Sequence, residues 1–120
     1  MKKKIALVVD DNQGHRYSIM TFLQIRRFDV ETASDGLQAL QMMGAKKYDL
    51  VFSDIEMPNM NGLELLHQIR QKNNQVPVIM ISSLGSLDSI RTAIAEGANS
   101  YITKPFSVEG MNNALTKVGF

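Results

Sequence analysis

The chain has 120 residues, of which 44% are hydrophobic and 21% are charged, and its formal net charge at pH 7 is +1. This composition excludes the disordered class, and the length suits one compact domain with a single core. The absence of cysteine excludes a disulfide framework, a thiolate metal site and a cysteine nucleophile. We therefore expect one domain over residues 1–120, whose chemistry comes from oxygen and nitrogen groups.

The chain begins with three lysines, Lys2, Lys3 and Lys4. Because the net charge is close to neutral, they indicate a solvated lead-in to the first strand rather than a nucleic-acid patch. The short apolar run that follows ends at Asp10, which makes it too short for a signal peptide or a spanning helix. We expect no direct binding to nucleic acid, no membrane anchor and a cytoplasmic location.

Short apolar runs alternate with segments of helical period, a pattern that predicts five βα units. The runs Ile5–Val9, Leu50–Phe52 and Val78–Ile81 are nearly continuously apolar, as central strands buried on both faces are. Weaker runs near Asp29–Thr32 and Ser100–Ile102 predict the two outer strands. The predicted fold class is α/β, a doubly wound five-stranded parallel sheet with helices on both faces.

Two of the predicted helices carry a clear apolar stripe at helical spacing. The stripes are Leu37, Leu40 and Met43 in the second helix, and Val108, Met111, Leu115 and Val118 in the last.

The ends of two other helices are marked by capping residues. Asn61 is placed to cap the third helix, with Glu64 reaching back in a capping box. Ser86 and Gly97 bracket the fourth helix, and the glycine suits a left-handed end position.

Polar side chains follow four of the five predicted strands. They are Asp10 and Asp11 after the first strand, Asp54 after the third, Ser82 and Ser83 after the fourth, and Lys104 after the fifth. In parallel α/β sheets, ligands bind beyond the carboxyl ends of the strands. Three carboxylates at one edge repel each other unless a cation lies among them, and Mg²⁺ prefers such oxygen ligands. The sequence predicts a magnesium site at this edge.

Each of these residues also has a purely structural interpretation when it is taken alone. Asp10 and Asp11 precede a helix that acids of this kind often cap, and Asp54 precedes a turn-rich loop. Lys104 alone is an ordinary solvated lysine. His15 and His67 invite a metal or phosphohistidine interpretation, but both lie in helical segments and we expect them on the solvated surface.

Four segments together carry a resemblance to a known family. They are VVDD ending at Asp11, SDIEMPNMNGLELL around Asp54, PVIMISS ending at Ser83, and AEGANSYITKPF ending at Phe106. In this order and at this spacing, the chain resembles the CheY-like receiver domains of two-component response regulators. The resemblance implies the strand order 2-1-3-4-5.

The resemblance also implies a role for each residue at the predicted site. Asp54 corresponds to the phospho-acceptor, which takes a phosphoryl group from a sensor histidine kinase or a phosphotransfer protein. Asp10, Asp11, Asp54 and the backbone carbonyl of Glu56 correspond to the Mg²⁺ ligands. Ser82 and Lys104 correspond to the groups that bind the phosphoryl oxygens. Such a domain catalyses its own modification but turns over no separate substrate.

The family switch implies two further roles. Tyr101 stands at the aromatic switch position, together with Ser82, and Pro105 is a candidate for a cis peptide bond. The signal is expected to reach a downstream target protein at the surface of the fourth helix, fifth strand and fifth helix. Ser83, Asn61 and Glu56 mark departures or variable positions, and Glu56 is a candidate to tune the phosphoryl lifetime.

Four other functions compete with this interpretation. A phosphatase of the haloacid dehalogenase type has Asp-x-Asp after its first strand, whereas here Asp10 and Asp11 are adjacent. A dinucleotide or flavin binder carries a Gly-rich phosphate loop, which is absent from the sequence. A phosphorylation-independent interaction module usually lacks an acidic or lysine position that this chain retains. The last alternative is a receiver domain cut from a longer regulator with a DNA-binding or enzymatic output domain.

Overall fold

The structure, a computed structural model, describes residues 3–83 and 87–120, so the expectations for Lys2 and Ser86 lie outside the described residues. Strands and helices alternate along the chain, as the βα pattern predicts. In chain order they are β1 (Ile5–Val9), α1 (Gln13–Ile25), β2 (Asp29–Ala33), α2 (Gly36–Ala45), β3 (Leu50–Asp54), α3 (Gly62–Gln71), β4 (Val78–Ser82), α4 (Leu87–Ala95), β5 (Ser100–Thr103) and α5 (Val108–Lys117).

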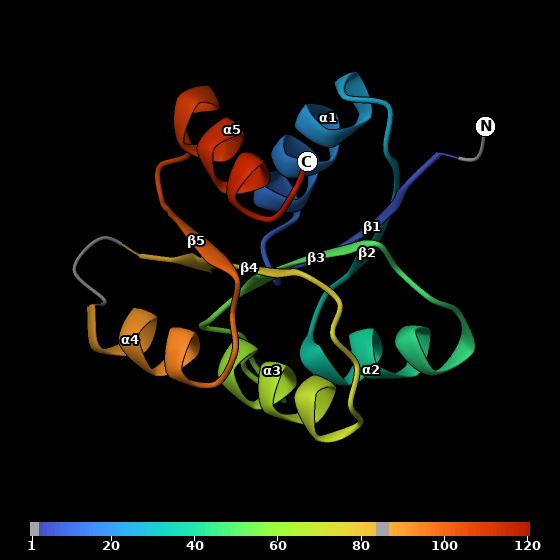
Figure 1. The fold of residues 1–120 in the computed structure, drawn as a ribbon, viewed down its shortest axis with the longest axis vertical. Coiled ribbons are helices and arrows are strands. Elements are labelled where there is room, and N and C mark those ends of the chain that lie inside the picture. The colour runs from blue at the N-terminus through green and yellow to red at the C-terminus, as the bar shows by residue number, and fades with distance from the viewer. Residues whose placement is uncertain (1–2, 84–86) are drawn as a thin grey trace.

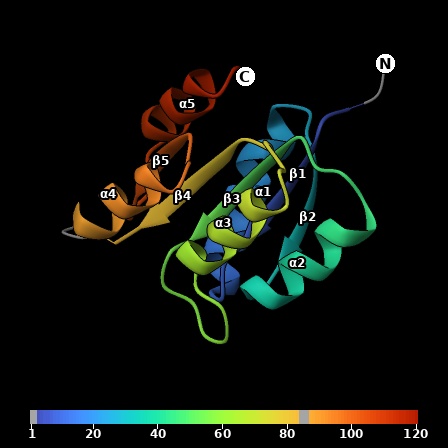
Figure 2. The ribbon, with the colours of Figure 1, turned by 60° about the horizontal axis from the view of Figure 1, so that its bottom comes forward.

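The five strands form one parallel sheet in the order β2-β1-β3-β4-β5, which confirms the predicted fold class and order. Helices α1 and α5 cover one face of the sheet, and α2, α3 and α4 cover the other (Figures 1 and 2). All strands run the same way, so their carboxyl ends meet at one edge. Within the described residues, no helix is both long and apolar enough to cross a membrane.

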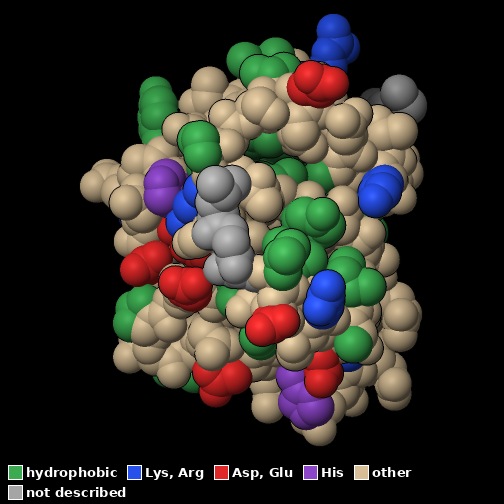
Figure 3. All heavy atoms as spheres, turned by 90° about the vertical axis from the view of Figure 1, so that its left-hand side faces the viewer, with side chains coloured by type: hydrophobic (Ala, Val, Ile, Leu, Met, Phe, Trp, Pro, Cys, Tyr) green, Lys and Arg blue, Asp and Glu red, His purple; other side chains and the backbone are tan. Residues whose placement is uncertain are grey.

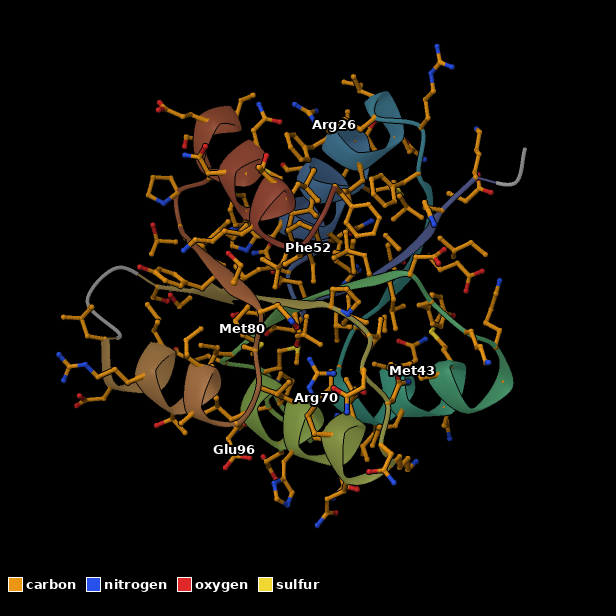
Figure 4. The ribbon with its side chains drawn as sticks, in the orientation of Figure 1. Arg26, Met43, Phe52, Arg70, Met80 and Glu96 are labelled. Carbon is orange, nitrogen blue, oxygen red and sulfur yellow. The ribbon has the colours of Figure 1, made fainter. Side chains whose placement is uncertain are left out.

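The core has one layer on each face of the sheet. Phe52 on β3 belongs to the layer beneath α1 and α5, whereas Met80 on β4 belongs to the layer beneath α2, α3 and α4 (Figure 4). Both side chains are fully buried. Every residue of β3 and β4 is buried, which is the burial predicted from their continuous apolar runs. The two layers hold the central strands rigidly and fix the edge where they end.

Two residues of the predicted apolar stripes lie outside the core. Leu37 in α2 is 50% exposed and Val108 in α5 is 63% exposed, so their assignment to the buried face was wrong. Both lie in the first turn of a helix that begins at the carboxyl edge of the sheet, where a side chain extends past the strands. Ala39 and Leu115, further along the two helices, are buried as core residues.

The predicted caps of the third and fourth helices are confirmed where the structure describes them. Asn61 Oδ1 accepts from the Glu64 backbone N–H at 2.9 Å, and Glu64 Oε1 accepts from the Asn61 N–H at 3.2 Å. Gly97 has a φ of +105°. Gly62 begins α3 so close to β3 that an added Cβ would lie 2.1 Å from the Asp54 carbonyl oxygen. This close approach places the start of α3 against the end of β3.

Candidate functional site

Asp10 lies at the end of β1 with its side chain turned into the protein. It is completely buried, and its Oδ1 accepts from the backbone N–H of Asn12 at 2.9 Å. Neither aspartate caps the following helix, because Asn12 does so by accepting from the His15 N–H at 2.9 Å. The capping interpretation of Asp10 and Asp11 is therefore wrong, and both carboxylates are available for another role.

Asp54 lies at the end of β3, next to Asp10 across the two paired strands. Its side chain is buried, and its Oδ2 accepts from Lys104 Nζ at 2.9 Å. The same Nζ is 3.8 Å from Asp10 Oδ2. One lysine therefore faces two buried carboxylates, and Lys104 is no ordinary solvated side chain. Figure 3 shows this side of the molecule, where acidic side chains lie next to a basic and a histidine side chain.

The charges at this edge do not cancel. Oxygens of Asp10, Asp11 and Asp54 lie within 4.8 Å of one another, and Asp11 is exposed. Burial raises the pKa of Asp10, and the charge of Asp54 raises it further. The Asn12 N–H, Lys104 and His15 lower the same pKa but do not outweigh the burial. The cluster is therefore short of positive charge.

A hard divalent cation fits this donor set. Asp10 Oδ2 is buried and has no hydrogen-bond partner, and three carboxylate oxygens lie close enough to surround one ion. Glu56 lies on the loop after β3, and its N–H donates to Asp54 Oδ1 at 3.3 Å. The loop thus begins at the cluster itself. Oxygen donors with a single nearby lysine suit Mg²⁺ better than they suit softer metals.

Ser82 ends β4 beside the same cluster. Its Oγ is buried and has no hydrogen-bond partner, while its carbonyl accepts from the Lys104 N–H at 2.9 Å. An unpaired buried hydroxyl is costly unless a ligand completes it. Ser83 next to it is exposed.

Two predicted residues lie beyond the charged cluster, on and after β5. Tyr101 is 43% exposed and lines a hollow of about 260 Å³ between β5 and α5. The Lys104–Pro105 peptide bond is cis.

His15 is the site residue that the sequence analysis missed. It was expected on the solvated surface, but it is half-buried and its Nδ1 lies 3.6 Å from Asp10 Oδ2. Its ring packs edge-on against Phe106, with 5.5 Å between centroids. The available signal was its position in the first turn of the helix that starts at Asp11. His67 matches the expectation: it is exposed and lies 3.2 Å from a Glu96 oxygen.

Comparison with known proteins agrees with this geometry. A family model described as response regulator receiver domain matches residues 6–116. The chain belongs to this family. The signalling switch of two-component systems is therefore its function class, rather than that of the phosphatases and dinucleotide binders considered above.

Individual relatives share about a third of their residues with this receiver domain. The response regulator MprA of Mycobacterium ulcerans (strain Agy99) is 33% identical over 103 residues, which are 86% of this chain and 44% of MprA. The DNA-binding transcriptional regulator NtrC of Escherichia coli (strain K12) is 35% identical over 109 residues, which are 91% of this chain and 23% of NtrC. The chain thus spans less than half the length of either relative.

Solved structures share the fold over nearly the whole chain. The chemotaxis protein CheY4 of Vibrio cholerae has a TM-score of 0.89 at 30% identity, covering 98% of this chain and 99% of CheY4. The receiver domain of the Francisella response regulator 1452 has a TM-score of 0.87 at 30% identity, covering 97% of each chain.

Proposed function

We propose that Asp54 accepts a phosphoryl group from the phosphohistidine of a sensor histidine kinase or a phosphotransfer protein. An oxygen of the Asp54 carboxylate forms the new bond to phosphorus, and the phosphorus–nitrogen bond of the donor breaks. The donor imidazole leaves with the electron pair of that bond. The observation that carries the proposal is the buried Asp54 carboxylate with Lys104 Nζ 2.9 Å away and two more carboxylates beside it.

Lys104 and Ser82 supply the polar contacts for the transferring group. The Lys104 ammonium already faces Asp54, so it offsets negative charge on the phosphoryl oxygens without a large movement. The unpaired Ser82 Oγ–H donates to one of these oxygens, which satisfies the buried hydroxyl. Most of the rate comes from positioning, because the groups are held before the donor arrives.

Asp10, Asp11, Asp54 and the Glu56 backbone carbonyl would hold Mg²⁺. When bound, this ion supplies positive charge that offsets the charge of the phosphoryl oxygens. Asp10 Oδ2 is buried and unpartnered, and its raised pKa reflects a carboxylate that lacks compensation in the metal-free protein. The residues therefore need the ion as much as the reaction does.

The phosphoryl group then changes the surface that a downstream target protein reads. Ser82 moves toward the new charge and leaves space behind it, into which the exposed Tyr101 ring rotates. Leu87 and Ile94 on α4 and Val108 on α5 are exposed on the elements around Tyr101. A partner that buries these apolar side chains distinguishes the two positions of the ring, and no contact with nucleic acid is needed.

We further propose that residues 1–120 form one receiver domain, that it works in the cytoplasm, and that it turns over no separate substrate. The family match over residues 6–116 supports the domain assignment. MprA and NtrC are both longer than the part matched here, so the partners and activity of the whole protein rest on this proposal alone.

The proposal is tested by incubating the protein with acetyl phosphate and Mg²⁺ and measuring the intact mass. Wild-type protein gains one phosphoryl group, and Asp54→Asn gains none. Asp29→Asn, which changes an exposed acid at the opposite end of the sheet, serves as the matched control and is modified like wild type. An unmodified wild-type protein would overturn the proposed function.

A further inference from the structure

The loop between β3 and α3 carries the Glu56 carbonyl, and its outer part is attached to the start of α2. Asn59 Nδ2 donates to Asp35 Oδ2 at 2.9 Å. The Gly36 N–H donates to the Met60 carbonyl at 3.2 Å. These two neighbouring contacts join segments that are more than 20 residues apart in the sequence. The loop is therefore held from outside the site as well as by Asp54.

Asp35 uses its two carboxylate oxygens for two different elements. Its Oδ1 accepts from the Gln38 N–H at 2.8 Å and caps α2, while its Oδ2 is the acceptor for Asn59. The Gln38 N–H, and after it the Asn59 amide, lower the pKa of Asp35. The carboxylate is charged at neutral pH, which strengthens both hydrogen bonds. Asp35 thus ties the loop to a helix whose own start it fixes.

The backbone at this contact has little freedom. Asn59 has a φ of +66°, a left-handed conformation that asparagine tolerates better than most residues. A Cβ added at Gly36 would lie 2.7 Å from the Met60 carbonyl oxygen, so only glycine permits this approach. Met57 and Met60 pack partly against the core. Asn59 itself is exposed, and its one described side-chain contact is the one to Asp35.

We propose that Asp35 and Asn59 are positioning residues that hold the metal-binding loop in its binding conformation before the cation arrives. Neither residue touches the cation, so their effect passes through the loop to the Glu56 carbonyl. A carbonyl that is already in place loses less conformational freedom on binding, which tightens the site. This inference rests on the proposed function, because it assumes that the Glu56 carbonyl is a Mg²⁺ ligand.

The test compares Mg²⁺ affinity by isothermal titration calorimetry in wild type and three variants. Asn59→Gly removes the amide but accepts the left-handed φ, and we expect about tenfold weaker Mg²⁺ binding, the lower end of effects from groups that support metal ligands. Asp35→Asn keeps the cap and can still pair with Asn59 through a turned amide, so it rescues most of the affinity. Asn73→Gly is the matched control, because Asn73 is also left-handed (φ +56°) but follows α3 at the far end of the sheet.

Two further readouts separate positioning from general stability. Without Mg²⁺, Asn59→Gly and Asn73→Gly are expected to unfold at similar urea concentrations, whereas only Asn59→Gly speeds amide hydrogen exchange at Glu56 and Met57. Wild-type protein that binds Mg²⁺ no more tightly than Asn59→Gly would overturn this inference alone. Wild-type protein that binds no Mg²⁺ would overturn the proposed function and this inference with it.

Discussion

At the scale of single residues, the site is defined by an imbalance of charge. Asp10 and Asp54 are both buried, and Lys104 contacts Asp54 more closely, at 2.9 Å against 3.8 Å for Asp10. Burial and the Asp54 charge raise the pKa of Asp10, so the ionised side chain opposes folding when no metal is present. Binding chemistry and stability therefore make opposite demands on this residue.

Asp10→Asn is expected to stabilise the metal-free protein at neutral pH. The amide keeps an oxygen for the Asn12 N–H but carries no charge, so we expect the free energy of unfolding to rise by about 1 kcal/mol, a typical size for one substitution. The same change weakens Mg²⁺ binding. Urea unfolding in a chelator checks the first effect, with Asp11→Asn as the exposed control. A less stable Asp10→Asn protein would contradict the account.

Glu56→Ala is expected to lengthen the life of the acyl phosphate. The Glu56 side chain is exposed, and its backbone N–H donates to Asp54, so the side chain starts at the mouth of the site. A carboxylate here can orient or deprotonate the hydrolytic water, an effect worth about 10²-fold in a well-placed general base. Decay of the phosphorylated protein in excess Mg²⁺ measures it. Decay that is equally fast or faster in both Glu56→Ala and Glu56→Gln would assign Glu56 to the solvated loop.

At the scale of elements, the outer strand β2 is attached to the sheet by a polar cluster away from the site. Glu31 on β2 accepts from Tyr48 Oη at 2.6 Å and from Lys46 Nζ, both on the segment between α2 and β3. The hydrogen bond from Lys46, and then that from Tyr48, lower the pKa of Glu31. The cluster thus links the edge strand to the connection that leads into β3, the strand of Asp54.

Glu31→Gln is expected to lower stability in a way that depends on pH. Because the folded pKa of Glu31 lies below its ordinary value of 4.5, its contribution is present above that value and is lost as the pH falls through the folded pKa. Wild type is therefore more stable than Glu31→Gln at neutral pH, and the difference narrows below pH 4.5. Urea unfolding across this range tests it. A difference that persists unchanged in acid would exclude an ionic contribution, and Tyr48→Phe should remove part of the same effect.

At the scale of the whole molecule, one edge of a rigid sheet gathers residues from four strands. Its position was predictable because apolar runs reveal parallel strands, and polar residues at the run ends must meet at one edge. The strand order came from the family resemblance. The pairing of Lys104 with Asp54 could not be predicted from spacing, since the two residues are 50 positions apart.

The details that escaped prediction depend on local backbone geometry. Three polar residues precede α1, and the sequence does not say which of them takes the extended conformation of a cap; in the structure it is Asn12. His15 lies near Asp10 because α1 starts where it does, so its position depended on the same unknown. Leu37 and Val108 follow the helical pattern but lie past the edge of the sheet. Periodicity gives a helix its apolar face but not the length over which a neighbour covers it.

The central claim is that Asp54 alone carries the phosphoryl group. The most direct measurement is borohydride reduction of the phosphorylated protein, which converts a phosphorylated aspartate to homoserine, followed by peptide mass spectrometry. The account predicts homoserine at position 54 and unmodified aspartate at Asp10 and Asp11. Homoserine at Asp10 or Asp11, or a phosphorylated protein with no reduced residue, would contradict it.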